Sequence, residues 1–380
     1  MIYLDNAATS FPKPECVHQE MQRFLREDAA NPGRAGHKMA VAAARMLGDV
    51  RRELVEFIGG KEISRLIFTL NCTDALNMAM KGLLEEGDHA ITTHLEHNSV
   101  SRPLQAMADA GKIKLTRVVA DSDGVIDPDE IARAITPKTK LVVMTHVANA
   151  LGTIQPVEEV GQIVREAGKL LLVDSAQSIG IIPIDVEAMK IDMLAFPGHK
   201  GLLGPTGTGG LYIGQRVGAI RVWREGGTGG DSSSPTQPVE FPFCLEGGTA
   251  NTVGLAGLGA GVRFVRGQGD AKLLRHERAL VGRFIDGIVD DERFNIVGAR
   301  DPAGHIGAVS ITIDGTHVQE AAAILDESFE IAVRSGLHCA PYTHKMMGTS
   351  PDGTLRVSPG YANTEQDIDA VLTALQQIVE

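Results

Sequence analysis

An acid, an amide and an amine in the middle of this chain could together carry chemistry. Asp174 and Gln177 follow an apolar run, and Lys200 stands just before a glycine-rich stretch, residues 201–209. A lysine amine condenses reversibly with an aldehyde, and an aspartate stabilises a protonated ring nitrogen. A glycine-rich loop lets the backbone come close to a phosphate. These are the groups that pyridoxal 5'-phosphate requires, so we predict a site for that cofactor.

Each of these residues also has a simpler explanation. Gln177 lies three residues after Asp174, within reach of the phenolic oxygen of the same ring. Taken separately, however, the residues fit a buried strand followed by a solvated glycine-lysine turn. Short motifs of this kind carry a real risk of false matches. The rest of the chain must therefore decide between the two interpretations.

The composition is that of a globular enzyme. Of the 380 residues, 43% are apolar and 22% are charged. This length predicts two domains, or one large domain with an appendage. The 36 lysines and arginines against 48 aspartates and glutamates give a net charge of −12. No general basic field is present to attract nucleic acid, so we expect no polynucleotide partner.

The sequence contains no recognisable targeting segment. The first residues include neither a basic region nor a long apolar one, so we expect no secretory signal. The apolar runs are too short to span a bilayer. The cysteines lack paired or metal-ligand spacing, which predicts free thiols in a reducing compartment. We therefore expect a cytoplasmic protein without a membrane partner and without a metal site.

Apolar, β-rich runs alternate with helical patterns in the first half of the chain. This alternation predicts βα units on a mostly parallel sheet, and runs of nearly continuous apolar residues predict strands that are covered on both faces. The predicted strands are Leu66–Thr69, His89–Thr93, Lys114–Val119, Lys140–Thr145, Lys169–Asp174, Asp192–Phe196 and Gly210–Ile213.

The second half begins with a loop. Residues 226–248 are rich in glycine, serine and proline, which predicts a long loop without regular structure. Thr364 is suited to cap a final helix that begins at Glu365. The remaining predicted elements are helices over Asn251–Arg266 and Lys272–Val289 and strands at Arg293–Val297, Ala308–Ile313 and Phe329–Val333.

Polar residues follow several of the predicted strands. Ligands of open α/β sheets bind outside the carboxyl ends of the strands, where Asp174 lies. Thr73 can cap a helix that begins near Asp74, and a helix N-terminus with a hydroxyl suits a phosphate. His97 and Asn149 follow two further strands, and His97 could stack on a pyridine ring and move protons. Alone, Thr73 fits an ordinary N-cap and His97 a solvated loop residue, but their convergence favours one site.

The whole chain, from the sequence Tyr3-Leu-Asp-Asn-Ala-Ala8 to the last helix, resembles the class V aminotransferase family of fold-type I pyridoxal phosphate enzymes. Within that family it is similar to the cysteine desulfurases and selenocysteine lyases. The resemblance implies an α/β fold with a large domain, residues 14–250, built on a mostly parallel seven-stranded sheet. It also implies a smaller α+β domain made of residues 1–13 and 251–380.

The resemblance assigns roles to residues around the lysine. It implies that Lys200 forms the Schiff base, His97 stacks on the cofactor and Asp174 pairs with the ring nitrogen. Further implied contacts are Asn149 with the substrate side, Gln177 with the ring oxygen, Thr73 and His199 with the phosphate, and Thr249 with the phosphate bound by a partner subunit. A homodimer with composite sites follows from the last assignment.

A second set of residues bears on the reaction. Cys339, in a segment that starts at Arg334, resembles the nucleophile of the desulfurases, and Arg356 resembles the arginine that binds the substrate carboxylate. An arginine guanidinium can donate two parallel hydrogen bonds to a carboxylate. Arg334 is assigned to the same substrate region. Arg334 and His338 could favour the reactive thiolate by their charge. The simpler explanation of Cys339 is an inert small residue in a turn.

These assignments predict a cysteine desulfurase. It would convert L-cysteine to L-alanine and hold the sulfur as a persulfide on Cys339 for transfer to an acceptor such as a protein, with His97 returning a proton. Selenocysteine lyase, another C–S lyase or an epimerase would share the lysine site, and a non-catalytic nucleotide-binding module remains an alternative. The chain departs from better-known branches at Pro197, where serine or threonine is common, and at Leu337, where histidine is often found.

Overall fold

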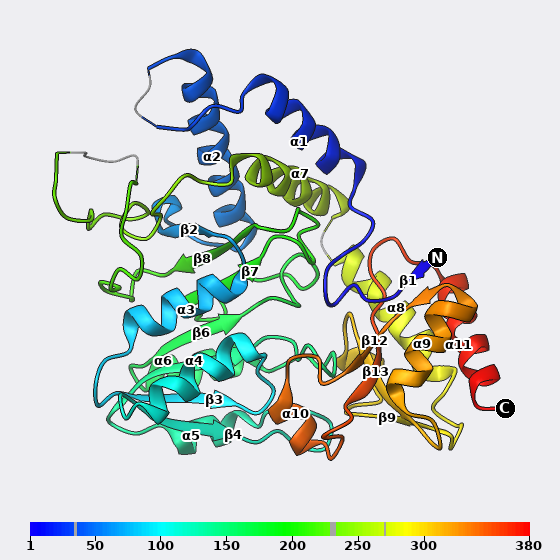
Figure 1. Cartoon of the computed structure of the whole chain (residues 1–380). Coiled ribbons are helices and arrows are strands. Elements are labelled where there is room, and N and C mark those ends of the chain that lie inside the picture. Colours follow the sequence, from blue (N-terminus) through cyan, green and yellow to red (C-terminus); the bar gives the residue numbers. More distant parts are fainter. Residues whose placement is uncertain (34–35, 229–232, 270) are drawn as a thin grey trace.

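The large sheet has seven strands. The computed structural model describes residues 1–33, 36–228, 233–269 and 271–380 (Figure 1). The strand order is β2-β8-β7-β6-β5-β3-β4, with β8 antiparallel to both neighbours and the other pairs parallel. The predicted sheet is confirmed. Its strands are β2 (Leu66–Thr69), β3 (His89–Thr93), β4 (Lys114–Val118), β5 (Thr139–Thr145), β6 (Leu170–Asp174), β7 (Met193–Pro197) and β8 (Gly209–Ile213).

Helices cover both faces of this sheet (Figure 1). Along β5, Leu141 and Val143 pack into one apolar core and Val142 and Met144 into the other, as the alternation of a strand requires. One core includes α3 (Cys72–Leu83) and α4 (Asn98–Asp109). The other includes α2 (Lys38–Phe57), α5 (Pro128–Ala134), α6 (Val157–Glu166) and α7 (Thr252–Gln268), and α1 (Glu15–Glu27) packs against α7.

A second, smaller sheet lies beside the first and has its own core. It runs in the order β12-β13-β10-β9, and its neighbours pair antiparallel. Near it, β1 and β11 pair in parallel, so the N-terminal strand lies with the C-terminal part of the chain (Figure 1). The elements are β1 (Ile2–Tyr3), β9 (Phe294–Ile296), β10 (Val309–Ile313), β11 (Ile331–Ala332), β12 (Arg334–Gly336), β13 (Thr354–Val357), α8 (Lys272–Asp286), α9 (Val318–Phe329), α10 (Pro341–Met346) and α11 (Glu365–Ile378).

Helix contacts bear on the domain division, which remains a prediction. Helix α7 packs against α1 and α2, whereas α8 and α9 both pack against α11. The chain therefore passes from the large-sheet side to the smaller-sheet side between α7 and α8. Among the described residues, no helix is both long and apolar enough to cross a membrane.

Two local predictions have clear outcomes. Thr364 caps α11 in a capping box with Asp367, as predicted. Helix α3 begins at Cys72, and its cap is Asn71, whose side chain accepts a hydrogen bond from the amide of Asp74. The prediction that Thr73 caps this helix was wrong, because Asn71 has the extended backbone that an N-cap needs and Thr73 is already inside the first turn.

The structure also revises the loop and strand predictions after residue 226. Residues 226–228 and 233–248 contain no helix or strand where they are described, and residues 229–232 lie outside the described residues. Helix α9 continues to Phe329 and ends at Glu330 in a left-handed conformation, so the predicted strand Phe329–Val333 is reduced to β11. Strands β12 and β13 were not predicted.

Candidate active site

Lys200 lies three residues after the end of β7, in a loop that the N-terminal segment holds. The carbonyl of His199 accepts hydrogen bonds from Lys13 Nζ (2.7 Å), Thr9 Oγ1 (3.2 Å) and the amide of Ser10 (3.2 Å). Ser10 Oγ also bonds the carbonyl of Lys200 at 3.1 Å. Burial, with the nearby Arg356, lowers the pKa of Lys200 to about 8. The amine is thus neutral far more often than that of a surface lysine.

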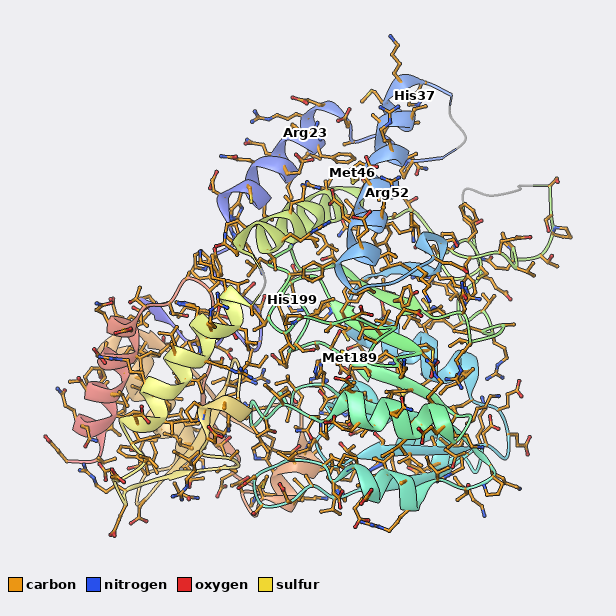
Figure 2. The ribbon with its side chains drawn as sticks, turned by 180° about the vertical axis from the view of Figure 1, so that it is seen from behind. Arg23, His37, Met46, Arg52, Met189 and His199 are labelled. Atoms are coloured by element: carbon orange, nitrogen blue, oxygen red, sulfur yellow. The ribbon has the colours of Figure 1, made fainter. Side chains whose placement is uncertain are left out.

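His199 itself lies at the junction of the two sheets. Figure 2 labels it between the large sheet and the part of the chain that carries α8. Its Nδ1 lies 3.0 Å from Thr9 Oγ1, and burial lowers its pKa to about 4, so the ring is neutral. Pro197, the last residue of β7, is buried and pairs with Gly209. Proline offers no hydroxyl here, and its position is buried within the sheet.

Asp174 ends β6 with a buried carboxylate. Its Oδ1 accepts hydrogen bonds from the amide of Ala176 (2.9 Å) and from Cys72 Sγ (3.4 Å). No described residue donates a hydrogen bond to Oδ2. Burial raises the pKa of Asp174, and burial beside this carboxylate raises the pKa of the Cys72 thiol well above its usual range. Cys72 is thus an uncharged donor that orients Asp174, a role that its sequence surroundings did not reveal.

Three side chains link the start of α3 to the start of α4. His97 caps α4, and its Nδ1 accepts a hydrogen bond from the amide of Ser99 at 3.0 Å and lies 2.8 Å from Ser99 Oγ. Ser99 Oγ lies 2.7 Å from Thr73 Oγ1, and Thr73 is exposed. Burial, with the charge of Lys200, lowers the pKa of His97 to about 4. His97 is therefore a neutral ring fixed by hydrogen bonds on one edge.

The Cys339 loop is anchored to the lysine site. The amide of Asn98 donates a hydrogen bond to the Cys339 carbonyl, and Asn149 Nδ2 donates one to the His338 carbonyl, both at 2.7 Å. The Cys339 Sγ lies 3.7 Å from Arg334 Nη2. His338 and Cys339 both have left-handed backbone, with φ of 48° and 58°. These contacts place the thiol of Cys339 next to a cation and the Cys339 backbone against the start of α4, which His97 caps.

His338 does not supply the charge that the sequence suggested. Its side chain is buried, and its Nε2 bonds Thr354 at 3.1 Å. Burial and the nearby Arg356 hold the pKa of His338 far below its usual range. The ring is therefore neutral, and Arg334 alone of the two can attract a thiolate.

Arg356 is a fully buried cation, with 1% of its surface exposed. Its Nη1 donates to the carbonyl of Asn149 (2.9 Å) and its Nη2 to Asp5 Oδ1 (2.8 Å). It stands directly opposite Arg334 in the pairing of β12 with β13. Asp5 was not predicted as a site residue, although it lies in the N-terminal sequence that carries the family resemblance. Its carboxylate offsets part of the positive charge that the two arginines bring together.

The predicted residues Gln177 and Thr249 do not join the group around Asp174 and His97. Gln177 Nε2 donates a hydrogen bond to the carbonyl of Ala7 at 3.0 Å, so its amide faces the N-terminal segment. Thr249 is exposed and lines a separate cavity of about 880 Å³ together with Trp223 and Phe243. That cavity shares no residue with the one beside Lys200. The predicted role of Thr249 toward a partner subunit stays a prediction.

The donor set fits pyridoxal phosphate. Lys200 offers the amine, and Asp174 offers Oδ2, to which no described residue donates a hydrogen bond. Asn149 Oδ1 is buried and has no hydrogen-bond partner among the described residues, so a polar ligand would satisfy it. The N-terminus of α3, with the exposed Thr73 hydroxyl, suits a phosphate. No described group of three or more acidic, histidine or cysteine residues could hold a metal ion.

Comparisons with known proteins agree with this geometry. The family model Aminotransferase class-V matches residues 2–371. A probable cysteine desulfurase from Methanothermobacter thermautotrophicus is 36% identical over 99% of this chain and 94% of that protein. The apo structure of a cysteine desulfurase from Thermococcus onnurineus NA1 has a TM-score of 0.94 and 35% identity, covering 100% of this chain and 94% of that one. The cysteine desulfurase CsdA from Escherichia coli has a TM-score of 0.88 and 26% identity, covering 99% and 94%.

Proposed function

Since this chain belongs to the class V aminotransferase family, we propose that it is a pyridoxal phosphate-dependent cysteine desulfurase. In this reaction the carbon–sulfur bond of L-cysteine breaks and a sulfur–sulfur bond forms at Cys339, which gives L-alanine and a persulfide. The carbon is reduced and the sulfur oxidised, so no outside oxidant is needed. The observation that carries the proposal is the anchoring of the Cys339 loop to Asn98 and Asn149, beside the lysine site.

We infer which residues hold the cofactor. Lys200 would bind it covalently, Asp174 would pair with its ring nitrogen, and His97 would stack on the ring. When bound, the cofactor withdraws electrons from the substrate, which loosens the α-proton and makes the sulfur electrophilic. Its remaining partners would be Gln177 at the ring oxygen, Asn149 on the substrate side, Thr73 and His199 at the phosphate, and Thr249 from the second subunit of a homodimer.

Separate residues of the protein would then bind the substrate and transfer protons. Arg356 and Asn149 would hold the substrate carboxylate, and Arg334 would lie near the substrate with its guanidinium beside the Cys339 sulfur. Lys200, with its lowered pKa, would take up and return protons near neutral pH. His97 would supply the final proton through its ring. The four cysteines are free thiols, in keeping with a cytoplasmic enzyme that passes its sulfur to an acceptor.

The proposal is tested by product analysis. Purified protein loaded with the cofactor is incubated with L-cysteine, and alanine is measured together with the mass of the peptide that contains Cys339. We expect equal amounts of alanine and of sulfur released or held, with a mass increase of one sulfur on Cys339. Parallel incubation with selenocysteine ranks the two substrates. Alanine production without sulfur on Cys339, or pyruvate in place of alanine, would contradict the proposal.

Cofactor uptake by the apoprotein should depend on pH through Lys200. Only the neutral amine attacks an aldehyde, and the pKa of Lys200 is about 8. The rate of uptake should therefore rise roughly tenfold per pH unit below pH 8 and level off above it. Stopped-flow absorbance of the cofactor from pH 6 to 9 measures this rate. Lys200→Arg should bind the cofactor without forming the covalent link, and a rate that is flat across this range would show that the amine is not limiting.

A further inference from the structure

A small cavity lies behind the lysine loop, where three parts of the chain meet. Its volume is about 30 Å³, which suffices for one small ion or a water molecule. The N-terminal segment contributes Asn6, Ala7 and Ser10, and the large-sheet side contributes Gln177, Ile181, Lys200, Gly201 and Leu203. The third part comprises Leu273 and Glu277 of α8, Gly307, and the turn 359–361. Whatever fills this cavity contacts both sides of the junction.

Glu277 is an unpartnered acid in the wall of this cavity. It is 6% exposed, and no described residue donates a hydrogen bond to it or pairs with its charge. Its Oε2 lies 3.4 Å from the position that a Cβ on Gly307 would occupy, so the absence of a side chain at Gly307 leaves the carboxyl group open on that side. Burial raises the pKa of Glu277 to about 8, and neither Lys200 nor Tyr361, the other titratable residues in the lining, offsets this.

A buried carboxylate without a partner is costly, so the group must bind either a proton or a cation. Between cations, the lining favours one of single charge. Glu277 is the one acid among the lining residues, and the remaining candidate ligands are neutral oxygens. Gln177 Oε1 is one of these, because it accepts no hydrogen bond from the described residues. Divalent ions prefer several carboxylates, and no described group of three or more such residues exists.

We propose that this cavity is a binding site for a monovalent cation, such as K⁺ or NH₄⁺, with Glu277 as its anionic ligand. A cation there neutralises the buried carboxylate and connects α8 and the turn 359–361 with the loop that carries Lys200. Occupancy of the site therefore stabilises the junction on which the lysine loop rests. The proposal concerns stability, so it stands or falls independently of the desulfurase reaction.

The test compares thermal unfolding of the holoenzyme in KCl and in choline chloride at equal ionic strength. At pH 8.5 we expect 100 mM K⁺ to raise Tm by about 2–4 °C relative to choline. A shift of this size is expected for a chain of this length when the ion concentration is well above its Kd. At pH 6.0 the proton occupies Glu277, so the shift should fall to less than half. Equal Tm values in KCl and choline at pH 8.5 would overturn the proposal.

Glu277→Gln is the matched control, because glutamine keeps the shape and removes the charge. It should abolish the K⁺-dependent shift, and a shift retained in E277Q would place the ion elsewhere. A second measurement needs no variant: the ²⁰⁵Tl NMR signal of Tl⁺ should broaden with the wild-type holoenzyme and sharpen again on addition of K⁺. A Tl⁺ signal that the protein leaves unchanged would equally overturn the proposal.

Discussion

Replacing Cys339 with serine should lower cysteine turnover by about 10³-fold or more while the cofactor stays bound. A serine hydroxyl is uncharged at neutral pH and cannot take up a sulfur atom as a stable product, whereas a thiolate can. Losses of this size are usual when a nucleophile is removed. Alanine formation and the persulfide mass are measured together, with the cofactor absorbance as the check on binding.

Cys16→Ser is the matched control for this variant. Cys16 is likewise partly exposed, and its Sγ lies 3.9 Å from the carbonyl of Ala260 in α7. C16S should turn over cysteine at the wild-type rate. If C339S kept turnover within tenfold of the wild type, Cys339 would not be the sulfur acceptor and another nucleophile would have to be sought.

Replacing Arg356 with glutamine should lower kcat/KM for cysteine by roughly 10² or more, mainly through KM. A charge-assisted hydrogen bond contributes about 1.5–3 kcal/mol, and each 1.4 kcal/mol corresponds to a factor of ten. The substrate carboxylate would lose both its bidentate partner and the positive charge. Steady-state kinetics with L-cysteine measure the effect. R356K should recover part of it, because lysine keeps the charge and loses the fork.

Arg356 also holds structure together, so a stability control is needed. Its loss leaves Asp5 and the carbonyl of Asn149 without their donor. Asp5→Asn keeps an acceptor for Nη2 and removes one negative charge, and we expect its KM to stay within about threefold of the wild type. A drop in Tm for R356Q without a change in KM would mean that Arg356 is structural and that the carboxylate is bound elsewhere.

The sequence predicted the large sheet well because its strands carry their own signal. Strands covered on both faces are rich in apolar and β-branched residues, and β2 and β3 have the predicted ends. Strands β12 and β13 carry no such signal, since Arg334, Gly336 and Arg356 are not typical strand residues. Their extended structure depends on pairing with each other and with β10, which no local pattern reveals.

The candidate site likewise contains residues that local sequence predicts and residues whose role depends on the folded structure. Lys200 and Asp174 were predicted from residue type and local sequence, and Cys339 was predicted from the resemblance of its segment to the desulfurases. Asp5 and Ser99 were missed, since each matters through hydrogen bonds that only the folded chain reveals. The effect of burial on His338 was missed for a related reason, because a histidine's charge depends on its surroundings and not on its neighbours in sequence.

The pairing of Arg334 with Arg356 has a consequence for the length of the substrate. Residues directly opposite on antiparallel strands point to the same face, with Cβ atoms roughly 4.5–5.5 Å apart. One arginine contacts the sulfur of Cys339, and the other is the proposed anchor of the carboxylate. In cysteine only Cα and Cβ separate the carboxylate carbon from the sulfur. The spacing of the two arginines across one strand pair therefore limits the distance between the carboxylate and the sulfur of the substrate. Homocysteine is longer by one methylene, so its sulfur would be displaced from the position that the sulfur of cysteine takes.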